Sequence, residues 1–160
     1  MVSMFELHGS HILKTSRELI WPLIFDPKGL LELIPGCQEI EQVSGKPGEF
    51  RGVIRINVPG VAGIYSTAVN ILRSDPPHYC FLEGEVQGKA GRIKGEAEFF
   101  IEEVNQHSQV TYNANGIITG ALSKISPRFI SSAVKTMITI ALESCERKLT
   151  TSKTTSSLKD

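Results

Sequence analysis

The sequence lacks the features of several specialised classes of protein. No apolar run approaches the roughly 18 residues that a membrane-spanning helix needs. The N-terminus has no basic segment and no long apolar core, so no secretory signal is visible. Lys and Arg together number 17 in 160 residues, as do Asp and Glu, so the chain has no net charge. A dedicated nucleic-acid-binding protein needs a basic excess to neutralise phosphates, and this balance argues against such a partner.

Cysteine is also scarce and scattered. Cys37, Cys80 and Cys145 form no CxxC pair, and an odd set of separate thiols is typical of a reducing cytoplasm rather than of a disulfide framework. Zinc needs three or four ligands at compatible spacing, and a phosphate-binding loop needs a GK[ST] ending after its glycines. Neither pattern is found, so we expect a cytoplasmic protein with no metal and no cofactor.

The sequence does contain enough apolar residues for one domain, since 41% are hydrophobic. Alternating apolar residues predict a first strand from Met4 to Leu13. Two short helices are expected next, the first beginning at a cap near Ser16 and the second capped by Asp26 with Pro27 in its first turn. Six more strands are then predicted near residues 40–43, 50–58, 65–71, 79–87, 93–104 and 110–119, separated by turn-forming residues.

A long helix is expected after the last strand. Apolar residues recur at helical spacing from Ile125 to Cys145 and predict a helix of roughly twenty residues, about 30 Å long. Beyond Leu149 the sequence is rich in Ser, Thr and Lys, a composition typical of disorder. We therefore expect one domain over residues 1–149 and a disordered polar tail over residues 150–160.

The order of these elements predicts an α+β fold. Strands joined by short turns are antiparallel neighbours, and a sheet of about seven such strands twists and curls. The long C-terminal helix can then lie across the concave face, leaving an apolar space between helix and sheet. Five glycines in or beside the strands indicate either sharp curvature or room for a ligand: Gly84, Gly88, Gly91, Gly95 and Gly116.

A set of aromatic and apolar side chains is expected to point into this interior. In a cavity they would line a ligand site, with tyrosine hydroxyls orienting a head group, whereas in a closed core they would simply pack together. His11 is a polar candidate for the same pocket, because its strand face also carries Phe5 and Leu7; such a histidine is either an acid–base group or a hydrogen-bonded core residue. The predicted cavity set is Trp21, Ile34, Tyr65, Phe99, Tyr112, Phe129 and Met137.

Several segments resemble the CoxG family of carbon monoxide dehydrogenase proteins, over about residues 4–148. The family commonly has Gly before Arg128, where this chain has Ser126-Pro127, and some members carry a longer tail that can hold a membrane anchor, whereas this tail is short and polar. The most specific matching segment is Trp21-x-x-Ile24-x-Asp26-Pro27-x-x-Leu30-x-x-x-Ile34-Pro35-Gly36-Cys37. Asp75-Pro76-Pro77, the glycines from Gly84 to Gly95, and Gly120-Ala121-Leu122-x-x-Ile125-x-x-Arg128-x-Ile130 are also similar.

The resemblance implies the helix-grip fold of the START/Bet v 1-like (SRPBCC) superfamily. It also implies an accessory protein that binds a hydrophobic small molecule, such as a quinone or lipid, and assists a molybdenum-dependent hydroxylase of the CO dehydrogenase type. Peripheral membrane contact stays open. No catalytic constellation is visible, so we expect no enzyme. Two alternatives remain: a polyketide cyclase or dehydratase of the same fold, with His11 as its acid–base group, and a protein-interaction module with a solid core.

Overall fold

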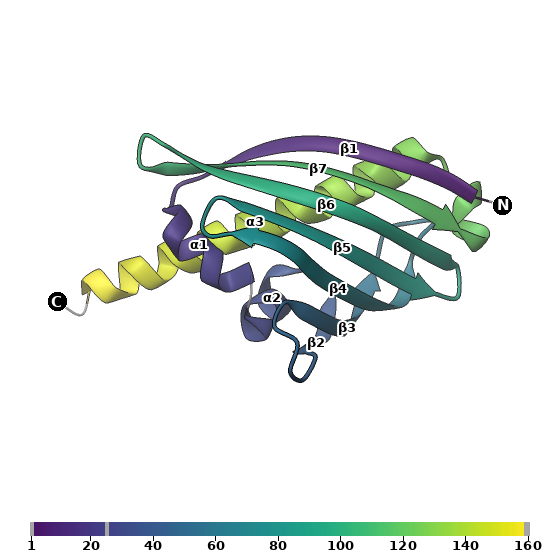
Figure 1. Ribbon diagram of the computed structural model, residues 1–160, viewed down its shortest axis with the longest axis horizontal. Helices are drawn as coiled ribbons and strands as arrows, with labels where there is room; N and C mark the ends of the chain where they lie inside the picture. The colour runs from purple at the N-terminus through teal and green to yellow at the C-terminus, as the bar shows by residue number, and fades with distance from the viewer. Residues whose placement is uncertain (1, 25, 159–160) are drawn as a thin grey trace.

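The computed structural model describes residues 2–24 and 26–158, with side chains described up to residue 150. These residues form one antiparallel sheet of seven strands in the order β1-β7-β6-β5-β4-β3-β2, together with three α-helices (Figure 1). The strands are β1 (Val2–Leu13), β2 (Cys37–Gln42), β3 (Glu49–Ile56), β4 (Gly63–Asp75), β5 (Tyr79–Gly88), β6 (Gly91–Val104) and β7 (His107–Thr119). The helices are α1 (Arg17–Ile24), α2 (Pro27–Leu33) and α3 (Pro127–Leu158), preceded by a 3-10 helix, η1 (Gly120–Lys124).

The sheet curves around α3, which crosses its concave face (Figure 1). On β7 the buried side chains alternate strictly with more exposed ones, as the pleat of a strand covered on one face requires. Ile118 and Val110 on β7 and Ile130 and Cys145 on α3 belong to one buried core. The predicted α+β architecture, a curved sheet of about seven strands around a long C-terminal helix, is confirmed.

The two short helices close one end of the sheet. The carbonyl of Ser16 accepts hydrogen bonds from the amides of Leu19 and Ile20 and so begins α1. The Asp26 carboxylate accepts a hydrogen bond of 3.1 Å from the Lys28 amide, and α2 begins with Pro27, as the sequence predicts. Helix α1 is only eight residues long and contains Pro22, in accordance with the short helix expected around that residue.

Helix α3 is tied to the first strand near both ends of their shared path. The Ser131 hydroxyl donates to the Glu6 carbonyl at 3.3 Å, and the Lys14 amide donates to Glu146 Oε2 at 2.9 Å. On its other side, Lys148 Nζ lies 2.7 Å from Glu32 of α2. These contacts close the seam between α3 and β1 and the C-terminal part of the seam between α3 and α2.

The C-terminal part of the chain differs from the expectation in two ways. Helix α3 spans 32 residues rather than about twenty, because no Gly or Pro follows Pro127 to end it; the domain end at residue 149 and the disordered tail stay predictions, and residues 159 and 160 lie outside the described ones. The helix η1 was not expected. It begins at Gly120 with a φ of 77° and buries Leu122, which closes the other end of the core.

Three glycines lie in one row across the concave face, since Gly95 is the register partner of both Gly84 and Gly116. A Cβ added at Gly95 would collide with the Asn115 carbonyl, and one at Gly116 would collide with the Phe5 ring. At Gly84 the nearest atom, the Ala68 carbonyl oxygen, lies 3.8 Å away. Gly95 and Gly116 therefore allow close packing within the curved sheet, whereas Gly84 borders open space.

This contrast generates a prediction about stability. Gly95→Ala is expected to lower the free energy of unfolding by about 2 kcal/mol or more, because backbone must move to accept the methyl group. Gly84→Ala is expected to change it by less than about 1 kcal/mol. Urea denaturation followed by circular dichroism measures both, and equal losses for the two variants would contradict the assignment of space at Gly84.

Candidate functional site

An elongated cavity lies between the concave face of the sheet and α3. It consists of three adjoining pockets, which we call the mouth, central and inner pockets, with volumes of about 410, 340 and 210 Å³. Ligand sites of drug-sized molecules have volumes in this range. Shared lining residues join the pockets into one series: Pro35, Ile56 and Met137 between the mouth and central pockets, and Ile34, Leu82, Ile138 and Ala141 between the central and inner pockets.

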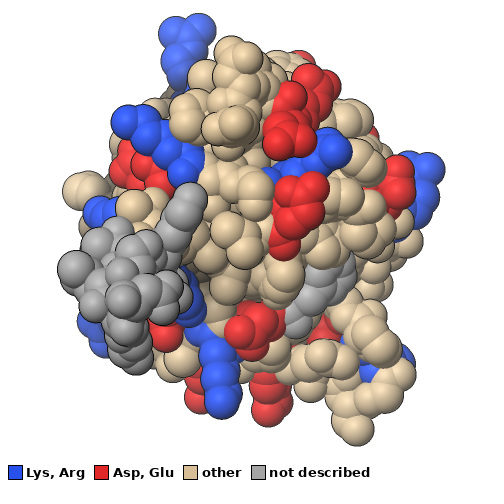
Figure 2. Space-filling model, turned by 90° about the vertical axis from the view of Figure 1, so that its left-hand side faces the viewer, with Lys and Arg blue, Asp and Glu red and all other residues tan. Residues whose placement is uncertain are grey.

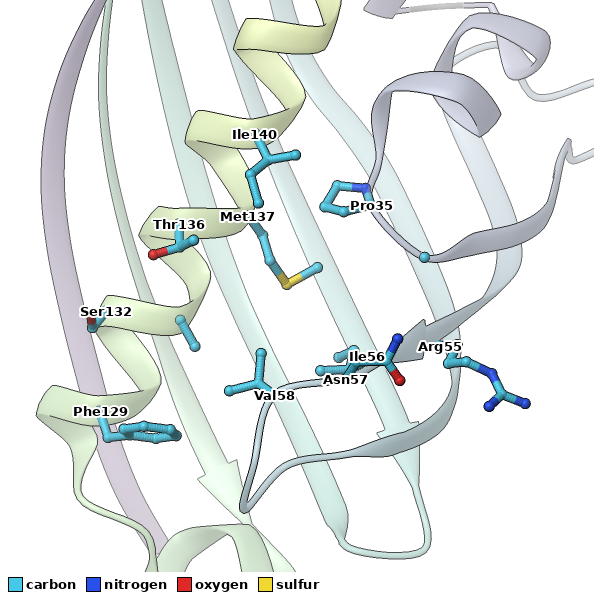
Figure 3. Close-up of a pocket in the computed structure, with 12 residues that line it drawn as sticks. Pro35, Arg55, Ile56, Asn57, Val58, Phe129, Ser132, Thr136, Met137 and Ile140 are labelled. Atoms are coloured by element: carbon cyan, nitrogen blue, oxygen red, sulfur yellow. The ribbon is translucent and has the colours of Figure 1, made fainter.

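The mouth pocket opens between the N-terminal half of α3 and the loops that flank β3. In Figure 3, Ile140 of α3 faces Pro35 across the gap, Phe129 points toward Val58, and Met137 points between them. Phe129 is 41% exposed and Ile140 39% exposed, so apolar side chains form the rim. The remaining lining residues include the polar Arg55, Asn57, Ser132 and Thr136.

The turn between α2 and β2 forms one wall of the mouth and has a rigid geometry. Gly36 adopts a φ of 80°, and its carbonyl accepts a 2.8 Å hydrogen bond from the Arg55 amide. The Cys37 amide donates to the Ile34 carbonyl at 3.1 Å. A Cβ at position 36 would collide with the Arg55 carbonyl, so only glycine fits here. The turn therefore holds Ile34 and Pro35 against the cavity.

The central pocket exists because small residues cover the sheet beneath α3. Larger side chains at these positions would reach the helix and fill the gap. The small residues on its sheet side are Gly84, Gly95, Ala97 and Ala114, and the helix contributes Val134, Met137, Ile138 and Ala141.

The inner pocket is the blind end of the cavity, enclosed by α1, α2, the sheet and the C-terminal half of α3. Its lining consists of aliphatic side chains, one phenylalanine and two thiols, with no charged or hydroxyl-bearing residue. Residues that define it are Ile20, Leu23, Leu33, Cys80, Phe99 and Cys145.

Burial controls the chemistry of the two thiols in the inner pocket. Desolvation raises the pKa of both Cys80 and Cys145 to about 11. Desolvation also raises the pKa of the half-buried Cys37, partly offset by the hydrogen bond from its thiol to the Glu39 carbonyl. Thiols that stay protonated at neutral pH are poor nucleophiles and poor metal ligands. The inner pocket therefore behaves as an inert apolar surface.

The structure brings five of the seven predicted cavity residues to pockets beneath α3. Ile34 lines the central and inner pockets, Phe99 the inner pocket, Met137 the mouth and central pockets, and Phe129 the mouth. Phe129 was expected in the interior and instead lies at the rim. Tyr65 lines a small adjoining pocket of about 40 Å³, also bordered by Met137.

The other predicted site residues lie outside the lining of these pockets. Tyr112 is 2% exposed, and its ring packs against Phe99 with ring centroids 5.7 Å apart, directly over Gly9. Trp21 packs against the core from α1 and is half-buried. His11 is half-buried on β1 opposite Val110, so the structure does not place an acid–base group in the cavity at that position.

Sequence reasoning missed several lining residues. Asn57 and Val58 follow a strand, where a turn was expected, and Ile140 lies on a helix face that the periodicity assigned to the core. Cys80 and Cys145 come from separate elements, and nothing in their spacing places them in one pocket. The glycine row was the available signal for the central pocket, and only the register of β5, β6 and β7 shows that the three glycines are adjacent.

A model of the CoxG family, described as a subunit of carbon monoxide dehydrogenase, matches residues 9–150. The chain belongs to the CoxG family. The match includes α1, α2, the strands from β2 to β7 and the part of α3 that lines the cavity. It confirms the resemblance carried by the segment ending in Pro35-Gly36-Cys37. A search of curated proteins finds no match.

Solved structures similar to this CoxG-family chain share its fold. A conserved protein from Geobacillus kaustophilus is 22% identical, with a TM-score of 0.86 over 92% of this chain and 97% of that one. The protein Ara h 8.0201 is 13% identical, with a TM-score of 0.71 over 93% and 99% of the two chains. An aromatase/cyclase from a Streptomyces species is 12% identical, with a TM-score of 0.62 over 92% and 96%. The fold is thus Bet v 1-like.

The described residues of this CoxG-family member offer neither a membrane span nor a metal site. No helix among them combines the length and apolar character that crossing a membrane requires. Within residues 2–24 and 26–158, no three His, Cys, Asp or Glu side chains gather as ligands of a metal ion would. Figure 2 shows the end of the molecule that bears the C-terminus, where acidic and basic side chains are interspersed over the visible face.

The burial of the thiols predicts their order of reaction. Alkylation with iodoacetamide at about pH 8 is expected to modify Cys37 first, because Cys80 and Cys145 are almost inaccessible and stay protonated. Labelling of the buried pair should rise as the pH approaches about 11 or when urea unfolds the chain. Peptide mapping by mass spectrometry measures each site, and equal rates for Cys37 and Cys80 at about pH 8 would contradict this placement.

Proposed function

We propose that this chain binds a hydrophobic small molecule, a quinone or a lipid, between its sheet and α3, and assists a molybdenum-dependent hydroxylase of the CO dehydrogenase type. The observation that carries the proposal is the continuous apolar cavity with one open end. A solid core would instead have favoured a pure interaction module. The expected mechanism is sequestration of the ligand from water, carried out by a cytoplasmic protein that performs no chemistry itself.

The size of the cavity is sufficient for useful affinity. Burial of apolar surface contributes about 25 cal/mol per Å², so hiding about 400 Å² of a ligand contributes about 10 kcal/mol. Ordering of the ligand and loss of its free motion offset part of this gain. A net value near 8 kcal/mol corresponds to a micromolar Kd, which suits a protein that must both take up and release its ligand.

Binding without turnover is supported by the chemistry of the lining. The inner pocket has no charged side chain among its lining residues, and acid–base catalysis needs a titratable group within hydrogen-bond reach of the substrate. His11 lies apart from the lining residues of the pockets. The aromatase/cyclase shares the fold at 12% identity, which supports no transfer of its activity to this chain.

The first test is chemical extraction. Protein purified from cells that make quinones and phospholipids is expected to release a stoichiometric apolar molecule into organic solvent, identified by mass spectrometry. Protein that is folded by circular dichroism and releases nothing would argue against the carrier role, provided that it also fails to take up quinone added in detergent.

Filling the central pocket is expected to abolish uptake. Gly84→Leu places a side chain in the open space beneath α3 and should weaken binding of the apolar dye anilinonaphthalene sulfonate at least tenfold in a fluorescence titration. Gln87→Leu is the matched control, because this exposed position on the same strand lies outside the lining of the pockets. Both variants should keep the parent melting temperature within a few degrees. Parent-like dye binding by Gly84→Leu would contradict the assignment of the site.

The partner half of the proposal follows from family membership and is tested separately. Surface plasmon resonance should detect binding of this chain to a purified three-subunit CO dehydrogenase-type hydroxylase. Absence of binding to that enzyme would remove the partner assignment and leave the ligand assignment in place.

A further inference from the structure

The chemistry of the cavity changes from one end to the other. The mouth pocket opens to water and carries Asn57, Ser132 and Thr136 among its lining residues, all three exposed (Figure 3). The inner pocket offers only hydrocarbon side chains and the protonated thiols of Cys80 and Cys145. A polar group on a ligand therefore finds water and hydrogen-bonding partners at the mouth and none at the blind end.

The tyrosine hydroxyls near the cavity are already used within the protein. Tyr65 donates to the Val61 carbonyl at 2.7 Å, and Tyr112 is hydrogen-bonded to Thr139. Neither hydroxyl is therefore placed to orient a head group, as the sequence had suggested. A polar head group in the central or inner pocket would lose its hydration without replacement, at a cost of several kcal/mol.

The cavity is also long rather than round. Its lining on α3 extends from Phe129 at the mouth to Cys145 at the inner pocket, a distance of about 24 Å at the rise of an α-helix. The three pockets succeed one another along this path and share lining residues only with their neighbours. Such a shape matches an extended chain better than a compact ring system.

We infer that the ligand is a single-tailed amphiphile whose small head group lies at the mouth and whose apolar tail ends in the inner pocket, beside Cys80 and Cys145. This orientation rests on the proposed function and specifies its ligand class: one long acyl or isoprenoid chain on a compact polar head. The opposite orientation would bury the head group among hydrocarbon side chains and leave the tail in water.

The chain contains its own reporter for this orientation. Trp21 is the only tryptophan. It lies on α1, whose residues Ile20, Leu23 and Ile24 line the inner pocket. Bromine atoms quench tryptophan fluorescence only over a short range. A fatty acid brominated near its methyl end should therefore quench Trp21 strongly, whereas one brominated near its carboxylate should quench it weakly.

The outcomes of this experiment separate the two proposals. Stearate binding, measured by calorimetry, tests the cavity itself; a folded protein that binds neither stearate nor a long-chain quinone would overturn the proposed function and the orientation with it. Binding of both brominated acids with stronger quenching by the methyl-end bromines supports the inference. Equal quenching, or stronger quenching by the carboxylate-end bromines, would overturn the orientation and leave the proposed function standing.

A second variant tests the position of the tail without fluorescence. Ala141 lines both the central and the inner pocket, so Ala141→Leu should narrow the passage between them. We expect stearate to bind at least tenfold more weakly, while octanoate, whose short tail stays in the central pocket, keeps its affinity. Glu143→Leu on the exposed side of α3 is the matched control. An equal loss for both acids in a variant with parent stability would contradict the inference.

Discussion

The space beneath α3 depends on the small side chains that cover the middle of the concave face. Gly84, Gly95, Ala97 and Ala114 cannot reach the helix, so the sheet and α3 meet at the two ends of the domain and not at its centre. Leu122 and Ile130 fill the core at one end, while Ile20 and Leu33 fill it at the other. The fold thus obtains its stability from the ends and leaves the middle available to a ligand.

The opening of the cavity follows from the way α3 is attached. Its hydrogen bonds with β1, through Ser131 and Lys14, close one side, and the ion pair of Lys148 with Glu32 lies at the far end of the other side. An exposed ion pair contributes about 0–1 kcal/mol, so burial of α1 and α2 against the core must supply most of that closure. The remaining gap is the mouth, whose opposite wall is held rigidly by the hydrogen bond between Arg55 and Gly36. Pro35 and Gly36, which carry the family resemblance, therefore have a structural reason to be there.

The fold was largely predictable because its signals are local. Alternation marked the strands, Asp26-Pro27 marked the start of α2, and helical spacing marked α3. The site was predictable only in part, because which inward side chain borders a void depends on its neighbours across the sheet. Tyr112 is buried over Gly9 instead of lining the cavity, a consequence of the pairing of β1 with β7. Phe129 lies at the rim because α3 begins beyond the edge of the core, a matter of packing that helical periodicity alone does not show.

The central claim is that the middle of this domain is an apolar hollow continuous with the mouth. A crystal structure determined under xenon pressure tests it most directly, because xenon enters dry apolar cavities. We expect xenon atoms beside Gly84 in the central pocket and beside Cys145 in the inner pocket, or an apolar ligand already occupying both. Side chains that meet across these positions, with no xenon and no ligand between α3 and the sheet, would contradict the claim.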